Sequence, residues 1–168
     1  MRKFGKVYAI LFLVVTISTA VAAQSVKEEM NNAKLGAILK ETVDKVEGIP
    51  GNWQVEYGEL IIYVLTDETN NRMRIFAPVI EEKDLETGQM KKMLEANFHS
   101  ALDAKYSLFQ EYVISVYTHP LRELHKAQFV DALQQVIILA KTFGDTYTST
   151  GLIFRPDLQE NKPNMKQN

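Results

Sequence analysis

Residues 53–80 read WQVEYGELIIYVLTDETNNRMRIFAPVI, and this stretch decides the fold. Its three runs, 53–57, 60–65 and 72–80, are rich in β-branched and aromatic residues, and a glycine and a polar turn segment separate them. Such short connections join antiparallel neighbours, because parallel strands need a crossover of about a dozen residues or more. We therefore predict a three-stranded antiparallel meander.

The third run assigns its side chains to two faces of the sheet. Met73 and Ile75 alternate with Arg72, Arg74 and Phe76, so the two sets point to opposite sides of the strand. The proline two residues after the last of these lacks an N–H group. We expect strand pairing to be restricted at that proline.

Apolar residues at helical spacing flank the meander on both sides. Before it, they predict a helix over residues 26–47, which the glycine and proline that follow should end. After it, residues 85–101 repeat the spacing and predict a second helix, with Phe98 among its core residues.

A hairpin and a third helix complete the predicted elements. Residues 106–108 and 112–116 alternate between apolar and polar side chains and form the hairpin. The third helix runs from residue 121 or 126 to residue 143 and contributes Leu133 to the core. The element order α-β-β-β-α-β-β-α predicts an α+β fold, with the helices packed on one face of an antiparallel sheet.

The first 23 residues have the build of a secretory signal peptide. Three basic residues precede an apolar run over residues 7–15, and small residues then place cleavage after Ala22 or Ala23. An uncleaved anchor is the alternative, but the apolar stretch is shorter than the ~20 residues that a span needs. We expect residues 1–23 to be removed and the mature protein to be periplasmic or secreted.

The rest of the chain predicts one domain and a tail. Residues 24–145 hold every predicted element and suffice for a single core. Residues 146–168 form the tail, which we expect to be disordered because its prolines, amides and scattered charges bury little apolar area.

The chain has 19 basic and 21 acidic residues without a basic stripe, which argues against nucleic-acid binding. It has no cysteine, so disulfides are excluded.

The sequence carries no recognisable catalytic motif. Its glycines stand singly, and His99, His119 and His125 are spread along the chain. His99 and Asp103 are four residues apart and could share a helix face as a metal pair, but we interpret them as a solvated helix end. The acidic run 81–86 lacks the oxygen spacing of a calcium loop. We expect no enzymatic activity, cofactor or metal.

Partner-binding residues are predicted on strand faces that three helices are too few to cover. Exposed aromatic patches often mark interfaces, and arginine pairs bind carboxylates or phosphates. The alternatives are that the aromatic residues complete the core and that the arginines form charge pairs across the strands. Trp53 is assigned to the core. The predicted partner-binding residues are Tyr63, Arg72, Arg74, Phe76, Val113 and Tyr117.

One segment carries a family resemblance. Residues 94–98, Leu-Glu-Ala-Asn-Phe, end the second helix, and the hairpin, Pro120-Leu121 and the long final helix follow. This arrangement resembles the type III secretion chaperone-like superfamily, especially its YbjN-like branch, in which a strand similar to residues 73–79 precedes the middle helix. The resemblance covers residues 30–145. It implies a non-enzymatic, often homodimeric fold that holds an extended segment of a partner protein.

The export signal separates this chain from secretion chaperones, which act in the cytoplasm on proteins awaiting export. We therefore predict a chaperone-like homodimeric module that binds a segment of another cell-envelope protein, with strand addition at a sheet edge as one route. The rival hypothesis is a small-ligand-binding protein or enzyme with a pocket between helices and sheet. There His99, Arg72 and Arg74 would make the polar contacts. A structural subunit of a larger assembly is a third hypothesis.

Overall fold

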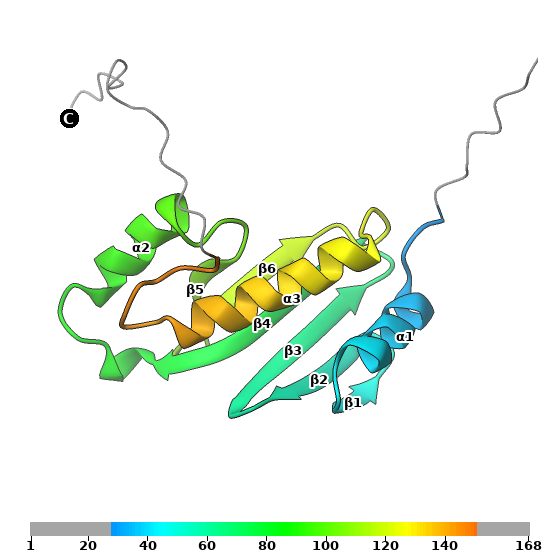
Figure 1. Ribbon diagram of the computed structural model, residues 1–168, viewed down its shortest axis with the longest axis horizontal. Coiled ribbons are helices and arrows are strands. Elements are labelled where there is room, and N and C mark those ends of the chain that lie inside the picture. The colour runs from blue at the N-terminus through cyan, green and yellow to red at the C-terminus, as the bar shows by residue number, and fades with distance from the viewer. Residues whose placement is uncertain (1–27, 151–168) are drawn as a thin grey trace, which may run out of the picture.

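The structure, a computed structural model, describes residues 28–150. The described chain forms an antiparallel sheet with the strand order β1-β2-β3-β4-β6-β5, together with three α-helices and one 3-10 turn (Figure 1). In chain order, the elements are α1 (Asn32–Thr42), β1 (Val46–Ile49), β2 (Asn52–Tyr57), β3 (Leu60–Asp67), β4 (Arg72–Glu81), η1 (Glu82–Asp84), α2 (Gln89–His99), β5 (Lys105–Phe109), β6 (Tyr112–His119) and α3 (Lys126–Lys141).

Helices and sheet enclose a single core. Helices α1 and α3 lie on the same face of the sheet, and α2 lies beside the edge strand β5 (Figure 1). Strand residues that point to the helices are buried, among them Val55, Val64 and Ile75, and they pack with Leu39 and Phe129. The predicted α+β fold, with helices on one face of an antiparallel sheet, is confirmed. Within residues 28–150, no helix is both long enough and apolar enough to cross a membrane.

The first helix is shorter than predicted, and a strand that the sequence analysis missed follows it. Helix α1 ends at Thr42 instead of near residue 47, and β1 pairs with β2 at the edge of the sheet. The cause is the turn at Pro50-Gly51. Proline followed by a glycine with a φ of 95° has the residue pattern of a type II turn. The segment interpreted as a helix end is therefore one arm of a hairpin.

Helix α1 packs closely on Trp53. The side chain of Asn31 caps the helix by accepting a hydrogen bond from Lys34 N at 2.9 Å. Gly36 faces the indole so closely that a Cβ at this position would lie 3.4 Å from the ring atom Cζ2. Trp53 is buried, so its assignment to the core is confirmed.

Pro78 limits strand pairing, as predicted. The register between β3 and β4 runs only to the pair Tyr63 and Phe76, and a bulge between Pro78 and Ile80 interrupts the pairing of β4 with β6. Because β3 and β4 part here, the end of the β2–β3 hairpin near Gly58 separates from β4. A cleft lies between this hairpin end and α3.

Helix α2 buries fewer side chains than the sequence predicts. Met93 and Ala96 face the core, whereas Met90, Leu94 and Phe98 are 43%, 66% and 56% exposed. The prediction that Phe98 is a core residue is therefore wrong. The reason is the place of the helix at the edge of the sheet, where only one side of it meets the core (Figure 1).

Asn97 joins α2 to the edge strand β5. Its Nδ2 donates a hydrogen bond to Tyr106 O at 3.1 Å, and its Oδ1 accepts one from Tyr106 N at 2.7 Å. The side-chain amide thus satisfies the backbone groups that a further strand would bind. The asparagine of the segment 94–98 closes part of the sheet edge.

Replacing Asn97 by alanine should lower the free energy of unfolding by about 1–3 kcal/mol, because two backbone groups of Tyr106 lose their partners. Urea unfolding measures the loss, and the exchange rate of the Tyr106 amide hydrogen should rise. Asn70→Ala is the matched control, since its Nδ2 bonds the exposed Asp67 Oδ2 at 2.7 Å in a turn. An unchanged exchange rate at Tyr106 would contradict this role of Asn97.

The packed domain continues past residue 145, where the sequence analysis begins the tail. Tyr147 and Ser149 are buried, and Ser149 bonds to the backbone of Ser100 and Ala101. The predicted boundary is therefore too early, because the segment after α3 returns to α2. The predicted leader and the tail from residue 151 lie outside the described residues.

Candidate partner-binding surfaces

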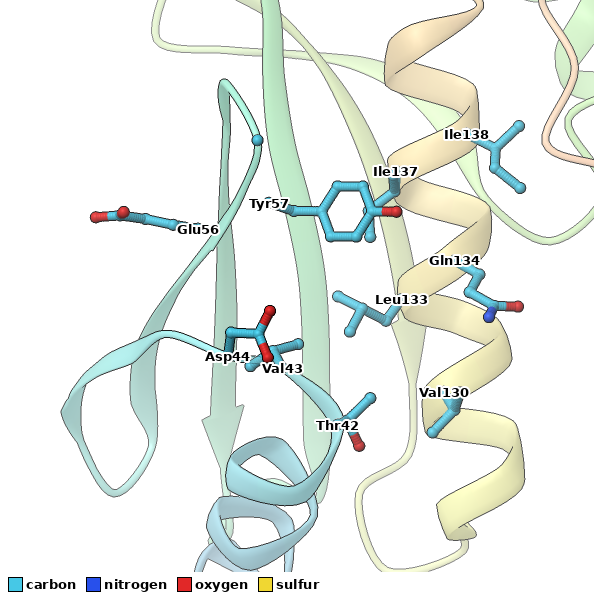
Figure 2. Close-up of a pocket in the computed structure, with 11 residues that line it drawn as sticks. Thr42, Val43, Asp44, Glu56, Tyr57, Val130, Leu133, Gln134, Ile137 and Ile138 are labelled. Carbon is cyan, nitrogen blue, oxygen red and sulfur yellow. The ribbon is translucent and has the colours of Figure 1, made fainter.

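A cleft of about 550 Å³ lies between helix α3 and the end of the β2–β3 hairpin (Figure 2). Segments far apart in sequence meet here: the residues at the end of α1, the hairpin end and the middle of α3. We call this surface the helix cleft. Its main lining residues are Val43, Asp44, Tyr57, Leu133, Ile137 and Ile138.

The helix cleft has an apolar floor and an aromatic wall. Leu133 and Ile137 are 3% and 7% exposed, and Leu133 points from α3 into the cleft (Figure 2). The ring of Tyr57 lies between the hairpin and α3, and 46% of the residue is exposed. Lys141 Nζ lies 4.5 Å from the centroid of this ring, a cation–π contact that helps to hold the tyrosine in place.

Charged groups lie only at the rim of the helix cleft. Glu56 points away from it (Figure 2), and its Oε1 lies 2.5 Å from Lys45 Nζ. This hydrogen bond holds the pKa of the Lys45 ammonium above its ordinary value. The exposed carboxylate of Asp44 makes no hydrogen bond or ion pair with any residue of 28–150. The cleft therefore offers apolar surface with one unpaired carboxylate, and no cluster of catalytic groups.

The second surface is the sheet face opposite the helices, which we call the open sheet face. Tyr63 and Phe76 stack across β3 and β4 with ring centroids 5.1 Å apart, and Phe109 of β5 meets Phe76 edge-on at 5.8 Å. A hollow of about 340 Å³ lies beside this aromatic row. Its residues on this face include Leu65, Arg74, Phe76, Phe109, Ile114 and Val116.

Four of the six predicted partner-binding residues lie on the open sheet face. Tyr63 and Phe76 are half-buried, and Arg72 and Arg74 are exposed on the same side of β4. Neither guanidinium forms an ion pair within residues 28–150, and Arg72 donates a hydrogen bond to Asn71 O at 3.0 Å. The alternative of cross-strand charge pairing finds no support here. A role of these four residues in binding stays a prediction.

The other two predicted partner-binding residues, Val113 and Tyr117, lie on the face that the helices cover. Val113 is 0% exposed and Tyr117 is 8% exposed, so the prediction that they meet a partner is wrong. They alternate along β6 with residues of the open sheet face. Alternation separates the two faces of a strand, but it does not say which face the helices cover.

The histidines do not form a site in the described part of the chain. The ring of His99 packs edge-on against Phe98 at 4.9 Å, His119 Nδ1 lies 2.7 Å from Pro120 O, and His125 precedes α3. Across residues 28–150, no group of three histidine, aspartate or glutamate side chains is placed to hold a metal ion. The rival hypothesis placed His99, Arg72 and Arg74 around one pocket. They do not line the helix cleft, and of the three only Arg74 lines the hollow of the open sheet face.

The residues of the helix cleft were not predicted from the sequence, although the rival hypothesis included a pocket between helices and sheet. Leu133 was assigned to the core, which its burial confirms, while Ile137 was placed only within the third helix and Tyr57 only within a strand. No local pattern could show that these three residues share a cavity wall. The one available signal is Pro78, which predicts that the strands part but not where the space appears.

The solved structures that are similar to this chain include two protein complexes. The crystal structure of the ExsC–ExsE complex matches with a TM-score of 0.52 at 13% identity, over 67% of this chain and 92% of the other. The structure of the Yersinia pestis type III secretion chaperone SycH with a stable fragment of YscM2 matches with a TM-score of 0.52 at 14% identity, over 67% and 98%. No family model and no curated protein matches the sequence.

At these identities the likeness shows a shared fold and nothing further. The matched share of each neighbour is nearly its whole length, so this chain contains a full copy of that fold. The resemblance to the type III secretion chaperone-like superfamily is thereby supported at the level of the fold. Membership of the YbjN-like branch stays a prediction.

Proposed function

We propose that this protein binds an extended, apolar segment of a partner protein in the helix cleft and has no enzymatic activity. The observation that carries the proposal is the cleft itself, an apolar trough whose floor is buried and whose wall is the exposed ring of Tyr57. Aromatic residues beside apolar pockets supply much of the energy of protein interfaces. The fold supports the proposal, since SycH of the same fold is a secretion chaperone solved with a fragment of YscM2.

The polar lining of the cleft favours a peptide over a small metabolite. Small-molecule sites usually add several convergent polar groups to an apolar pocket, and these groups fix the orientation of the ligand. The polar side chains that line the helix cleft are few. Asp44 and Gln134 are available to a ligand, the hydroxyl of Thr42 donates to Ile38 O at 2.7 Å, and Glu56 is engaged by Lys45 and points away. A segment with apolar side chains and a basic residue near Asp44 fits this lining.

We also propose that the chain acts in the cell envelope and belongs to the YbjN-like branch. The basic and apolar leader over residues 1–23 supports export. The residues 94–98, Leu-Glu-Ala-Asn-Phe, support the branch through their resemblance to it in sequence. A partner of this protein is then another exported protein.

The open sheet face is the proposed site of homodimer formation. Its aromatic row of Tyr63, Phe76 and Phe109 is large and apolar, and no helix of residues 28–150 covers it. Contiguous apolar patches of this kind commonly mark protein interfaces. Arg72 and Arg74 lie at one end of the row and add charge at its rim.

The experiment that tests this function is affinity capture of the tagged chain from cross-linked cell envelopes, with its native mass measured alongside. We expect one dominant envelope protein and a native mass of two copies. A clean monomer without a protein partner would contradict the proposal and favour the small-ligand or enzymatic hypothesis. Association only with fixed neighbours of a larger assembly would favour a structural subunit.

A further inference from the structure

A proline lies in an inner strand of the sheet. Pro78 belongs to β4, which has β3 on one side and β6 on the other. Because proline has no backbone N–H group, sheets mostly confine it to edge strands and bulges. The bulge between Pro78 and Ile80 relieves only the side of β6. On the side of β3 the proline costs the sheet a hydrogen bond, and residues that break such a rule are often functional.

The missing N–H group of Pro78 belongs to the side of β3. Thr66 N donates a hydrogen bond to Gly51 O at 3.0 Å, so the backbone groups of Thr66 point toward β2. Successive residues of a strand point these groups to opposite neighbours, which directs those of Ile61 toward β4. The register of β3 and β4, continued by two residues, sets Ile61 opposite Pro78. Pro78 cannot donate the N–H group that the carbonyl of Ile61 would accept in this pair.

The end of the β2–β3 hairpin therefore extends beyond the part of β3 that pairs with β4. Glu56 pairs with Ile61 and Tyr57 pairs with Leu60 in this end, whereas no residue of β4 pairs with either Ile61 or Leu60. In Figure 1, β3 and β4 separate toward this end. Tyr57, the aromatic wall of the helix cleft, thus lies on a hairpin end that strand pairing does not hold to β4.

The opposite wall of the helix cleft is fixed to the sheet. Strand β4 stays paired with β6 past the bulge, as far as Glu81 and Tyr112. Helix α3 is tied to β6, since Ser115 Oγ donates a hydrogen bond to Val136 O at 3.0 Å. The distance between the two walls consequently depends on how closely the hairpin end approaches β4.

We propose that Pro78 is a positioning residue for partner binding, and that it holds the helix cleft open by preventing β3 from pairing with the end of β4. This inference rests on the proposed binding of a partner segment in the helix cleft, and it names the residue that sets the width of the cleft. With an N–H group at position 78, the ladder can continue to Ile62 and Ile61, and paired strands lie about 4.8 Å apart. The hairpin end then moves toward β4, and the cleft narrows.

The first test measures the position of the hairpin end without a partner. Pro78→Val supplies the N–H group together with a side chain that favours strands. The chain has no cysteine, so Glu59→Cys in the hairpin turn and Asp84→Cys after β4 attach two spin labels at defined, exposed positions. We expect a shorter distance between the labels in the full chain with Pro78→Val than in the chain with Pro78. An unchanged distance overturns the proposal.

The second test measures partner binding. Tagged Pro78→Val protein should capture on the order of tenfold less of the envelope protein that the wild type captures, because a narrowed cleft no longer admits a segment beside Tyr57. Adding Ile61→Pro removes the facing N–H group and should restore both the label distance and the capture. Pro120→Val makes the same exchange at an exposed proline before α3 and should change neither.

The two tests separate this inference from the function on which it rests. An unchanged label distance overturns the role of Pro78 alone, and Tyr57→Ala still tests binding in the helix cleft. A shorter distance with undiminished capture overturns binding in the helix cleft, and the proposal with it. A folded double variant with Ile61→Pro that does not regain binding also overturns the proposal. The label distance of Pro78→Val decides the matter where the double variant does not fold.

Discussion

Replacing Phe129 by alanine should lower the free energy of unfolding by about 3–5 kcal/mol, the range for a large aromatic residue removed from a packed core. Phe129 is 0% exposed in the first turn of α3, where it belongs to the core between helices and sheet. Its loss leaves a cavity that the surrounding strands can fill only in part. Urea unfolding of the two purified proteins measures the difference.

Phe98→Ala is the matched control for this prediction. Phe98 is 56% exposed on α2, so the same change should cost no more than about 1 kcal/mol. The helical spacing of apolar residues predicted Phe98 in the core, so this pair of variants tests the fold itself. Equal losses from the two substitutions would show that α2 is not placed as described.

Replacing Tyr57 by alanine should weaken binding of the partner segment at least tenfold. The ring forms the wall of the helix cleft, and truncation of a central aromatic residue commonly costs about 2 kcal/mol or more of binding energy. Because Tyr57 is 46% exposed, the free energy of unfolding should change by no more than about 1 kcal/mol. Titration of the captured partner against wild-type and variant protein measures the affinity.

Tyr112→Ala is the control for the binding experiment. Tyr112 is 41% exposed, close to the value for Tyr57, but it lies beside Phe109 on the open sheet face. We expect its affinity for the partner segment to stay within about twofold of wild type, since a residue outside the interface contributes little. The reverse order of the two effects would place the partner on the open sheet face.

The meander of the central strands could be predicted because side-chain alternation and the turn residues between the runs indicate the same strands. Alternation placed Met73 and Ile75 on the face opposite Arg74 and Phe76, and the structure confirms both sets. The edge strand β1 was missed for a specific reason. Apolar residues at helical spacing ran on past the end of α1, and Pro50 was taken for the end of a helix instead of the centre of a turn.

How the helices and strands pack against one another could not be predicted from the sequence. The periodicity of α2 correctly identified a helix, but it could not show that Leu94 and Phe98 lie on the side away from the sheet. The prediction that Val113 lies at an interface was wrong for the same reason, since Val113 lies under the helices. The helix cleft needs Val43, Tyr57 and Leu133 together, and only the folded chain brings them to the walls of one cleft.

Photo-cross-linking from two positions tests the central claim, partner binding in the helix cleft, most directly. A photoreactive phenylalanine analogue is placed at residue 57 in one protein and at residue 112 in another, and cells that express each are irradiated. We expect a covalent adduct with one envelope protein from position 57, with the cross-linked peptide extended and apolar, and little adduct from position 112. An adduct formed only from position 112, or none from position 57, would contradict the account.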